Sequence, residues 1–100
     1  MTLVTRLCAA ALIATAPLTT LAQEITLRLH YFLPENSFVP AHILTPWADR
    51  IEAESGGRIK VDRYPSMALG GRPADLVDQV ADGVADVVWT LPGYTPGRFP

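Results

Sequence analysis

The sequence predicts an α/β domain, in which a parallel sheet with strand order 2-1-3 is joined by crossover helices. Three segments have strand character, near residues 25–32, 58–64 and 85–91, and two segments with helical spacing separate them, at about 44–55 and 73–82. Each connection is long enough for a helical crossover, so no hairpin is expected between these strands. Right-handed crossovers and the charges of the second strand place the first strand in the middle.

The first strand is predicted from strict alternation of apolar and polar residues. One face carries Ile25, Leu27, Leu29 and Tyr31. His30 alternates onto the opposite, polar face and is interpreted as structural, as is His42 near the start of the first helix. Neither histidine has an acidic residue spaced to complete a metal site with it. The strand ends in the loop Phe32-Leu33-Pro34-Glu35-Asn36-Ser37.

The first helix is predicted from an apolar stripe. Its members are Leu44, Trp47, Ala48 and Ile51, and Trp47 is expected in the core. Thr45 could cap a helix that starts at Pro46, since proline is comfortable at the first helical position. The other option is a helix that starts near Ser37 and is kinked at Pro46. Gly56 and Gly57 end the helix.

The rest of the chain continues as a strand, a helix and a third strand. The charges of strand 58–64 indicate an edge of the sheet. Pro73 begins the second helix, with Asp75 in its first turn, where acidic residues are favoured. The third strand is almost continuously apolar after Asp86, which is typical of a parallel sheet covered by helices on both faces.

Residues 1–22 are predicted to be a signal peptide. Arg6 supplies the basic start, an uncharged apolar run follows, and Ala22 suits the last position before cleavage. A membrane anchor is the alternative, but the run is short and Pro17 interrupts it. The only cysteine, Cys8, lies within this segment, so the remaining chain offers no disulfide, thiol nucleophile or cysteine ligand. The protein is therefore expected to be exported and periplasmic.

Several function classes lack the residues they need. Without Arg6 the chain keeps seven of its eight basic residues against ten acidic ones, which does not favour nucleic-acid binding. No G-x-G-x-x-G follows the first strand, where the sequence reads "FLPENS". The pair Gly70-Gly71 lacks the lysine and spacing of a phosphate-binding loop, and no G-x-S-x-G elbow is present. We therefore expect no cofactor, no metal and no catalytic residue in this segment.

The candidate ligand site lies at the carboxyl ends of strands one and three, which are adjacent in the order 2-1-3. In open α/β sheets ligands bind at these ends. The aromatic rings there offer flat apolar surface, and the polar side chains can donate hydrogen bonds to an anion. The candidate ligand-binding residues are Phe32, Asn36, Ser37, Trp89, Thr90 and Tyr94.

Each candidate has a structural alternative. Trp89 could be a core or interface residue of an apolar strand, and Tyr94 could brace its loop. Asn36 and Ser37 could cap the first helix. Arg98 could hold a carboxylate by a bidentate fork, but an arginine in such a loop more often faces solvent.

The segments "LRLHYFLPENS", "PWADRIEAESGGRIKVDRYPSMALGG" and "LVDQVADGVADVVWTLPGYTPGRFP" together carry a family resemblance. The chain resembles the extracytoplasmic solute-binding subunits of TRAP (tripartite ATP-independent periplasmic) transporters, and its "PGRFP" ending is similar to the organic-acid-binding branch. The resemblance implies a two-lobed periplasmic-binding-protein fold that traps a ligand, usually a carboxylate, between its lobes. It also implies membrane permease subunits as partners, uptake driven by an ion gradient, and a clamping arginine in the other lobe.

Members of this family are longer than this chain. Residues 23–100 are therefore expected to be the N-terminal part of lobe one, incomplete, and by themselves poorly soluble or only partly ordered and unable to bind organic acids at micromolar levels. The expected function is capture of a small organic acid, with C4-dicarboxylates and other acids left open. Two alternatives are an exported α/β enzyme whose catalytic residues lie beyond Pro100 and a small exported interaction domain.

Overall fold

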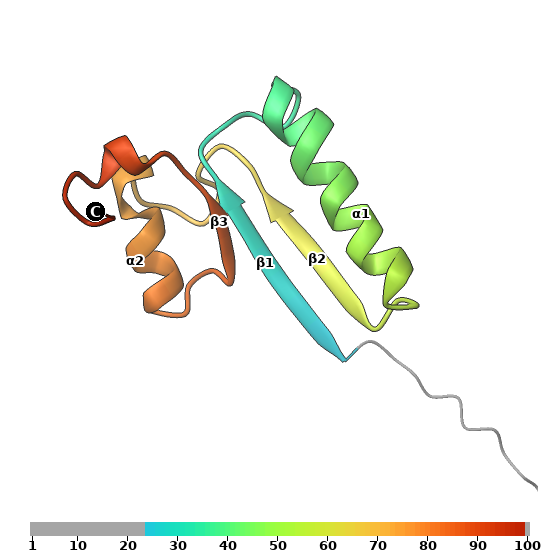
Figure 1. Ribbon diagram of the computed structural model, residues 1–100. Helices are drawn as coiled ribbons and strands as arrows, with labels where there is room; N and C mark the ends of the chain where they lie inside the picture. The colour runs from blue at the N-terminus through green and yellow to red at the C-terminus, as the bar shows by residue number, and fades with distance from the viewer. Residues whose placement is uncertain (1–23, 100) are drawn as a thin grey trace, which may run out of the picture.

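The computed structural model describes residues 24–99, so the predicted signal peptide, residues 1–22, lies outside the described residues. The strands β1 (Ile25–Tyr31), β2 (Ile59–Tyr64) and β3 (Val87–Trp89) form one parallel sheet in the order β2-β1-β3 (Figure 1). The predicted fold class, strand order and parallel pairing are confirmed. β3 is shorter than predicted.

Asp86 explains why β3 starts late. Its carboxylate accepts the backbone N–H of Arg28 at 2.9 Å, and its own N–H donates to the Arg28 carbonyl at 3.0 Å. A side chain thus takes the place of one rung of the ladder between β1 and β3. The strand pairing itself begins at Val87, which lies opposite Leu29.

Helix α1 (Thr45–Glu54) continues a helical segment that begins earlier in the chain. Residues 38 and 39 are already helical, and a π turn follows over Pro40–Leu44. Thr45 has helical backbone angles and donates its N–H to the Pro40 carbonyl, so the expectation that Thr45 caps the helix was wrong. The option of a start near Ser37 is right. Pro46 cannot donate to the helix ladder, and the wider turn directly before Thr45 is where the chain adapts to it.

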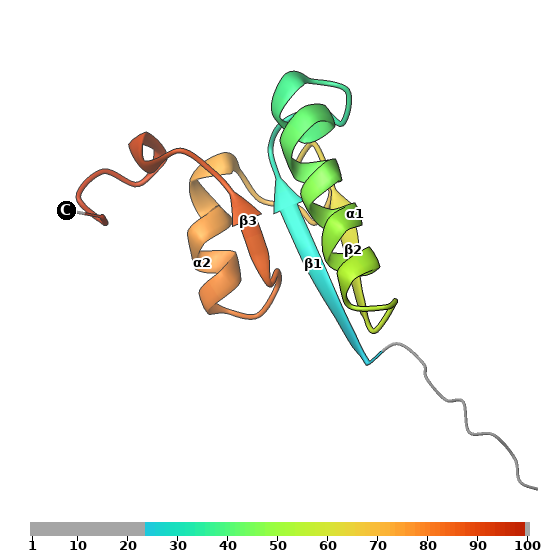
Figure 2. The same ribbon diagram turned by 45° about the vertical axis from the view of Figure 1, so that its right-hand side comes forward.

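Helix α2 (Leu76–Ala81) follows a 3₁₀ turn over Pro73–Asp75, which confirms the predicted second helix. The Asp75 carboxylate accepts the backbone N–H of Arg72 at 2.8 Å, and this bond holds the pKa of Asp75 below its ordinary value. The two helices lie on opposite sides of the sheet, as Figures 1 and 2 show from two directions.

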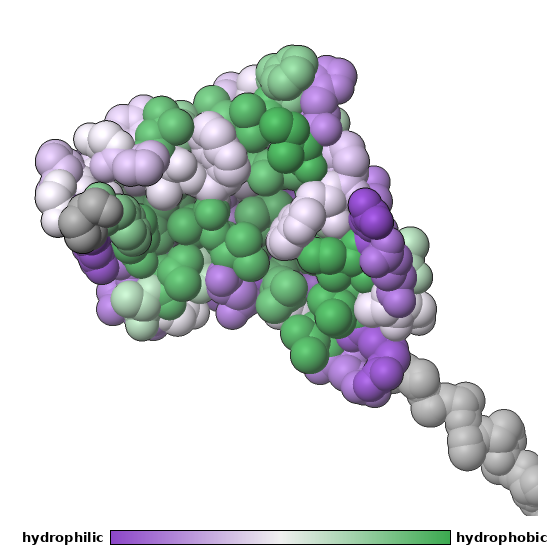
Figure 3. All heavy atoms as spheres, in the orientation of Figure 1, coloured by the Kyte–Doolittle hydropathy of each residue, from purple (hydrophilic) through white to green (hydrophobic). Residues whose placement is uncertain are grey.

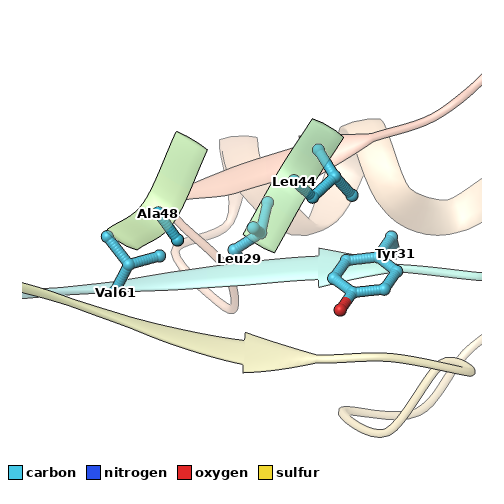
Figure 4. Packing of buried hydrophobic residues seen from close by; sticks show 5 residues of the cluster. All are labelled: Leu29, Tyr31, Leu44, Ala48 and Val61. Atoms are coloured by element: carbon cyan, nitrogen blue, oxygen red, sulfur yellow. The ribbon is translucent and has the colours of Figure 1, made fainter. Parts of the chain in front are cut away.

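The core lies between α1 and the sheet. Its buried members are Leu29, Tyr31, Leu44, Ala48 and Val61, drawn in Figure 4. Trp47 was expected in the core but is 39% exposed, which corrects that prediction. It borders an open groove instead, since no element of residues 24–99 covers this end of the stripe.

This groove, called the apolar groove below, has a volume of about 190 Å³. It is lined by Leu29, Ile43, Leu44, Trp47, Val87, Val88 and Trp89. Figure 3 shows hydrophobic residues gathered in a band across the middle of this face. The groove joins the start of α1 to β3, so one apolar face of the third strand is left open within the described residues.

His30 lies on the other face of β1, beneath α2, and is fully buried. Its Nε2 accepts the backbone N–H of Leu69 at 3.1 Å, so Nδ1 carries the proton and donates to Gln79 Oε1 at 2.7 Å. Gln79 Nε2 in turn donates to the Gly70 carbonyl at 2.9 Å. The interpretation of His30 as structural is confirmed, because both ring nitrogens tie β1 to α2 and to the connector after β2.

Tyr31 gives a prediction for alkaline stability. Its hydroxyl is buried and has no hydrogen-bond partner among residues 24–99. Burial raises the pKa of the hydroxyl above its ordinary value, although Arg63 acts in the opposite direction. A raised folded-state pKa gives stability that is fully present below pH 10 and is lost as the pH rises through the folded-state value.

Tyr31→Phe, in a full-length protein that carries this segment, should therefore remove part of the loss of stability above pH 10. At pH 7 it should change the free energy of unfolding by less than about 1 kcal/mol, because no described hydrogen bond is lost. Chemical denaturation at pH 7, 9 and 11 measures both effects. A cost above about 2 kcal/mol at pH 7 would show that the hydroxyl has a partner outside residues 24–99.

Candidate functional site

Three aromatic rings meet at the carboxyl ends of β1 and β3. Phe32 lies 5.8 Å from Trp89 between ring centroids, with the ring planes at 43°. Phe32 also lies 5.3 Å from Tyr94 in an edge-to-face arrangement at 87°. We call Phe32, Trp89 and Tyr94 the aromatic cluster. Phe32 is its centre, and its neighbours come from a segment more than 50 residues further along the chain.

The strand register and one turn build this cluster. Tyr31 lies opposite Trp89, which brings the next residue of the first loop, Phe32, to the end of β3. After β3 a 3₁₀ turn over Pro92–Tyr94 returns the chain, and the Tyr94 N–H donates to the Leu91 carbonyl at 3.0 Å. Tyr94 remains 40% exposed, while Phe32 and Trp89 are half-buried. The cluster can therefore offer flat apolar surface to a ligand at the sheet edge.

Trp89 also packs against the core beneath α1 and borders the apolar groove. The two interpretations made from the sequence, a ligand contact and a core contact, are therefore compatible in position. Trp89 lies on the α1 face, as its neighbour Tyr31 does, and it contacts Phe32 at the strand ends.

The polar candidates are more dispersed than the rings. Ser37 donates its hydroxyl hydrogen to the Pro34 carbonyl at 2.6 Å, and its own carbonyl accepts the Ala41 N–H at 3.0 Å. Ser37 thus organises the start of the helical segment. Asn36 is exposed in the turn before it, and Thr90 is half-buried at the start of the loop after β3. Ligand contacts of these three residues stay a prediction.

Arg98 pairs with Asp78 of α2 at 2.6 Å. Both side chains are substantially exposed, so the pair contributes at most about 1 kcal/mol to stability. Its consequence is geometric, because it fastens the loop after β3 to α2. The alternative of a bidentate fork to a ligand carboxylate is not favoured by this arrangement.

The other cations of the described segment also have partners. The pairs are Arg28 with the Val84 carbonyl, Arg50 with Glu54, Arg58 with Glu24, Lys60 with Asp62, Arg63 with the Thr45 hydroxyl, and Arg72 with Asp75. Residues 24–99 therefore bring no unpaired cation to the aromatic cluster. Within the same residues there is no group of three metal-ligating side chains, and no helix is long and apolar enough to cross a membrane.

Sequence reasoning missed two residues at this edge, Ser66 and Met67. Both have positive φ, 54° and 57°, which costs about 1–2 kcal/mol for a residue other than glycine. The Ser66 N–H donates to the Leu33 carbonyl and the Met67 N–H to the Tyr31 carbonyl, each at 3.0 Å. Neither residue type favours this conformation, so the sequence held no signal for it.

No protein-family model matches the sequence. The chain is 39% identical over 88 residues to a Comamonas testosteroni protein named outer membrane transporter protein TsaT, and the match covers 88% of this chain and 25% of that protein.

Solved structures of TRAP solute-binding proteins also match the chain, two of them at higher sequence identity. A marine metagenome TRAP solute-binding protein, specific for aromatic acid ligands and crystallised with 3-hydroxybenzoate, is 53% identical with a TM-score of 0.75, over 79% of this chain and 25% of that one. A Rhodoferax ferrireducens TRAP solute-binding protein with copurified benzoate is 52% identical with a TM-score of 0.72, over 75% and 23%. A Bordetella bronchiseptica TRAP periplasmic solute-binding protein with bound (R)- and (S)-mandelate is 35% identical with a TM-score of 0.67, over 74% and 23%.

The chain thus spans about a quarter of the length of the proteins it matches. The resemblance stated from the sequence is confirmed.

Proposed function

We propose that this chain, which has the sequence and fold of part of a TRAP solute-binding subunit, forms one wall of a periplasmic site for an aromatic carboxylate. The observation that carries the proposal is the aromatic cluster at the ends of β1 and β3. The flat ring of a ligand can pack against such a surface edge-to-face or offset-stacked. The binding free energy of such a contact exceeds what the buried area alone provides.

The ligands of the similar structures support this choice of acid. 3-Hydroxybenzoate, benzoate and mandelate each combine one aromatic ring with one carboxylate, and each is bound by a TRAP solute-binding protein. We therefore narrow the proposed ligand from small organic acids in general to those that carry an aromatic ring. An aromatic surface explains why an acid with a ring would be preferred to an aliphatic dicarboxylate.

The carboxylate needs a partner that this segment does not offer. Every cation within residues 24–99 already has a hydrogen-bond or ion-pair partner. The two lobes would therefore contact different parts of the ligand. This segment packs against the ring, and an arginine of the second lobe, as the resemblance implies, pairs with the carboxylate.

Capture rather than chemistry is the proposed activity. The protein would be exported, hold the acid in the periplasm and deliver it to membrane permease subunits for uptake driven by an ion gradient. Closure of a second lobe over the aromatic cluster would exclude water and strengthen the polar contacts to the carboxylate.

Calorimetric titration of a full-length protein that carries this segment tests the proposal. 3-Hydroxybenzoate, benzoate and mandelate should bind at micromolar or tighter levels, and succinate should bind far more weakly. Cyclohexanecarboxylate is the matched control, because it keeps the carboxylate and the ring size but has no π system. It should bind roughly 3- to 10-fold more weakly than benzoate, which corresponds to an aromatic contact of about 0.5–1.5 kcal/mol. Tighter binding of succinate than of any aromatic acid would contradict the proposal.

A further inference from the structure

We propose that Met67, in the connector after β2 (residues 66–71), forms a second side of the proposed ligand site and sets its preference for acids with a flat apolar ring. This inference rests on the proposed function. Its first basis is backbone conformation, since Ser66 and Met67 are the two residues other than glycine within 24–99 that have positive φ. Such residues persist where the surrounding structure fixes them, and they concentrate at binding sites.

The position of the pair is fixed by hydrogen bonds to the first loop. The carbonyls of Tyr31 and Leu33, which accept from Met67 and Ser66, flank Phe32 in the chain. β1 lies between β2 and β3, and Trp89 of β3 lies opposite Tyr31 of β1. At the carboxyl edge of the sheet, Met67 and Trp89 therefore lie on opposite sides of the segment that carries Phe32. Figure 1 shows the connector passing from the end of β2 beside the end of β1 toward α2.

The connector is held from its other end as well. The Leu69 N–H donates to His30 Nε2, and the Gly70 carbonyl accepts from Gln79 Nε2. Gly71 has positive φ, and a Cβ there would lie 2.6 Å from Gln79 Nε2, so a side chain at this position would displace the Gln79 amide from its hydrogen bond to Gly70. These contacts fix a conformation that Ser66 and Met67 do not favour by themselves.

The two side chains differ in a way that assigns the role to Met67. Ser66 is exposed, whereas Met67 is half-buried at the sheet edge. Methionine is flexible and polarisable and makes favourable contacts with aromatic rings through its sulfur. Held by its N–H at the residue before Phe32, Met67 can adapt to a bound ring, so the site would have a rigid aromatic side and an adaptable apolar one.

Glycine substitutions separate this role from a turn that only connects two elements. Met67→Gly removes the conformational strain that a side chain causes at positive φ. The melting temperature of the full-length protein should therefore stay unchanged or rise. If the side chain contacts the ligand, the same variant should weaken 3-hydroxybenzoate binding at least fivefold and lower the preference for benzoate over succinate. Met67→Leu keeps an apolar side chain and should stay within about twofold of the natural protein.

Ser66→Gly is the matched control, because it relieves the same backbone conformation one residue earlier and removes an exposed side chain. It should change affinity by less than about twofold. Unchanged affinity in Met67→Gly would overturn the inference while leaving the proposed function in place. Equal losses in both glycine variants would also overturn it, since they would indicate backbone rigidity rather than the Met67 side chain. A natural protein that binds no aromatic acid would contradict the proposed function and this inference together.

Discussion

Trp89→Ala should weaken binding of an aromatic acid by roughly 30- to 150-fold in a full-length protein that carries this segment. The estimate combines a lost ring contact with lost apolar burial, together about 2–3 kcal/mol. Trp89 also packs against the core, so the variant should lose some stability as well. Binding measured well below the melting temperature separates the two effects, because the folded fraction is then close to complete.

Trp47→Ala is the control for this experiment. Trp47 also borders the apolar groove, but it lies on α1 and the ring contacts that build the aromatic cluster do not include it. Its loss should change affinity by less than about threefold. Trp89→Phe should recover most of the affinity, since a flat ring remains. Equal losses for the two alanine variants would indicate that the apolar groove, and not the aromatic cluster, dominates the effect on binding.

His30→Ala should lower the free energy of unfolding by about 3 kcal/mol. The substitution leaves a cavity at a fully buried position, and it removes the partners of the Leu69 N–H and of Gln79. Because these bonds hold the connector after β2, the backbone around Met67 should become more open to hydrogen exchange. Denaturant unfolding and exchange of the Leu69 amide measure the two consequences.

His42→Ala is the matched substitution at the other histidine. His42 is exposed and packs its ring against Phe38 at 4.7 Å, with no buried hydrogen bond described. It should cost no more than about 0.5 kcal/mol. A similar cost for both histidines would contradict the view that the buried bonds of His30 stabilise this edge of the sheet.

The sequence was sufficient for the architecture. Alternation over 25–31 and the apolar stripe of the first helix are local signals, and crossover connections leave few topologies for three such strands. The position of the aromatic candidates also followed from the sequence, because the carboxyl ends of neighbouring parallel strands meet at one edge of the sheet. The sequence therefore predicts that Phe32, Trp89 and Tyr94 lie near one another.

Other features depend on segments that are distant in the chain. His30 is buried because α2 covers its face, and Arg98 is paired because the loop after β3 returns to Asp78. Trp47 has the spacing of a core residue, yet the described chain places no element over it. Helical spacing tells which residues share a face, but not how far the neighbouring elements extend over that face.

The sequence by itself thus determined the strand order, the two crossovers and the aromatic residues at the strand ends, because each is set by short-range pattern and chain connectivity. Only the tertiary structure decided the partners of His30 and Arg98 and the left-handed backbone of Ser66 and Met67. The physical reason is that these features are fixed by hydrogen bonds and packing from residues far along the chain, which outweigh local preference.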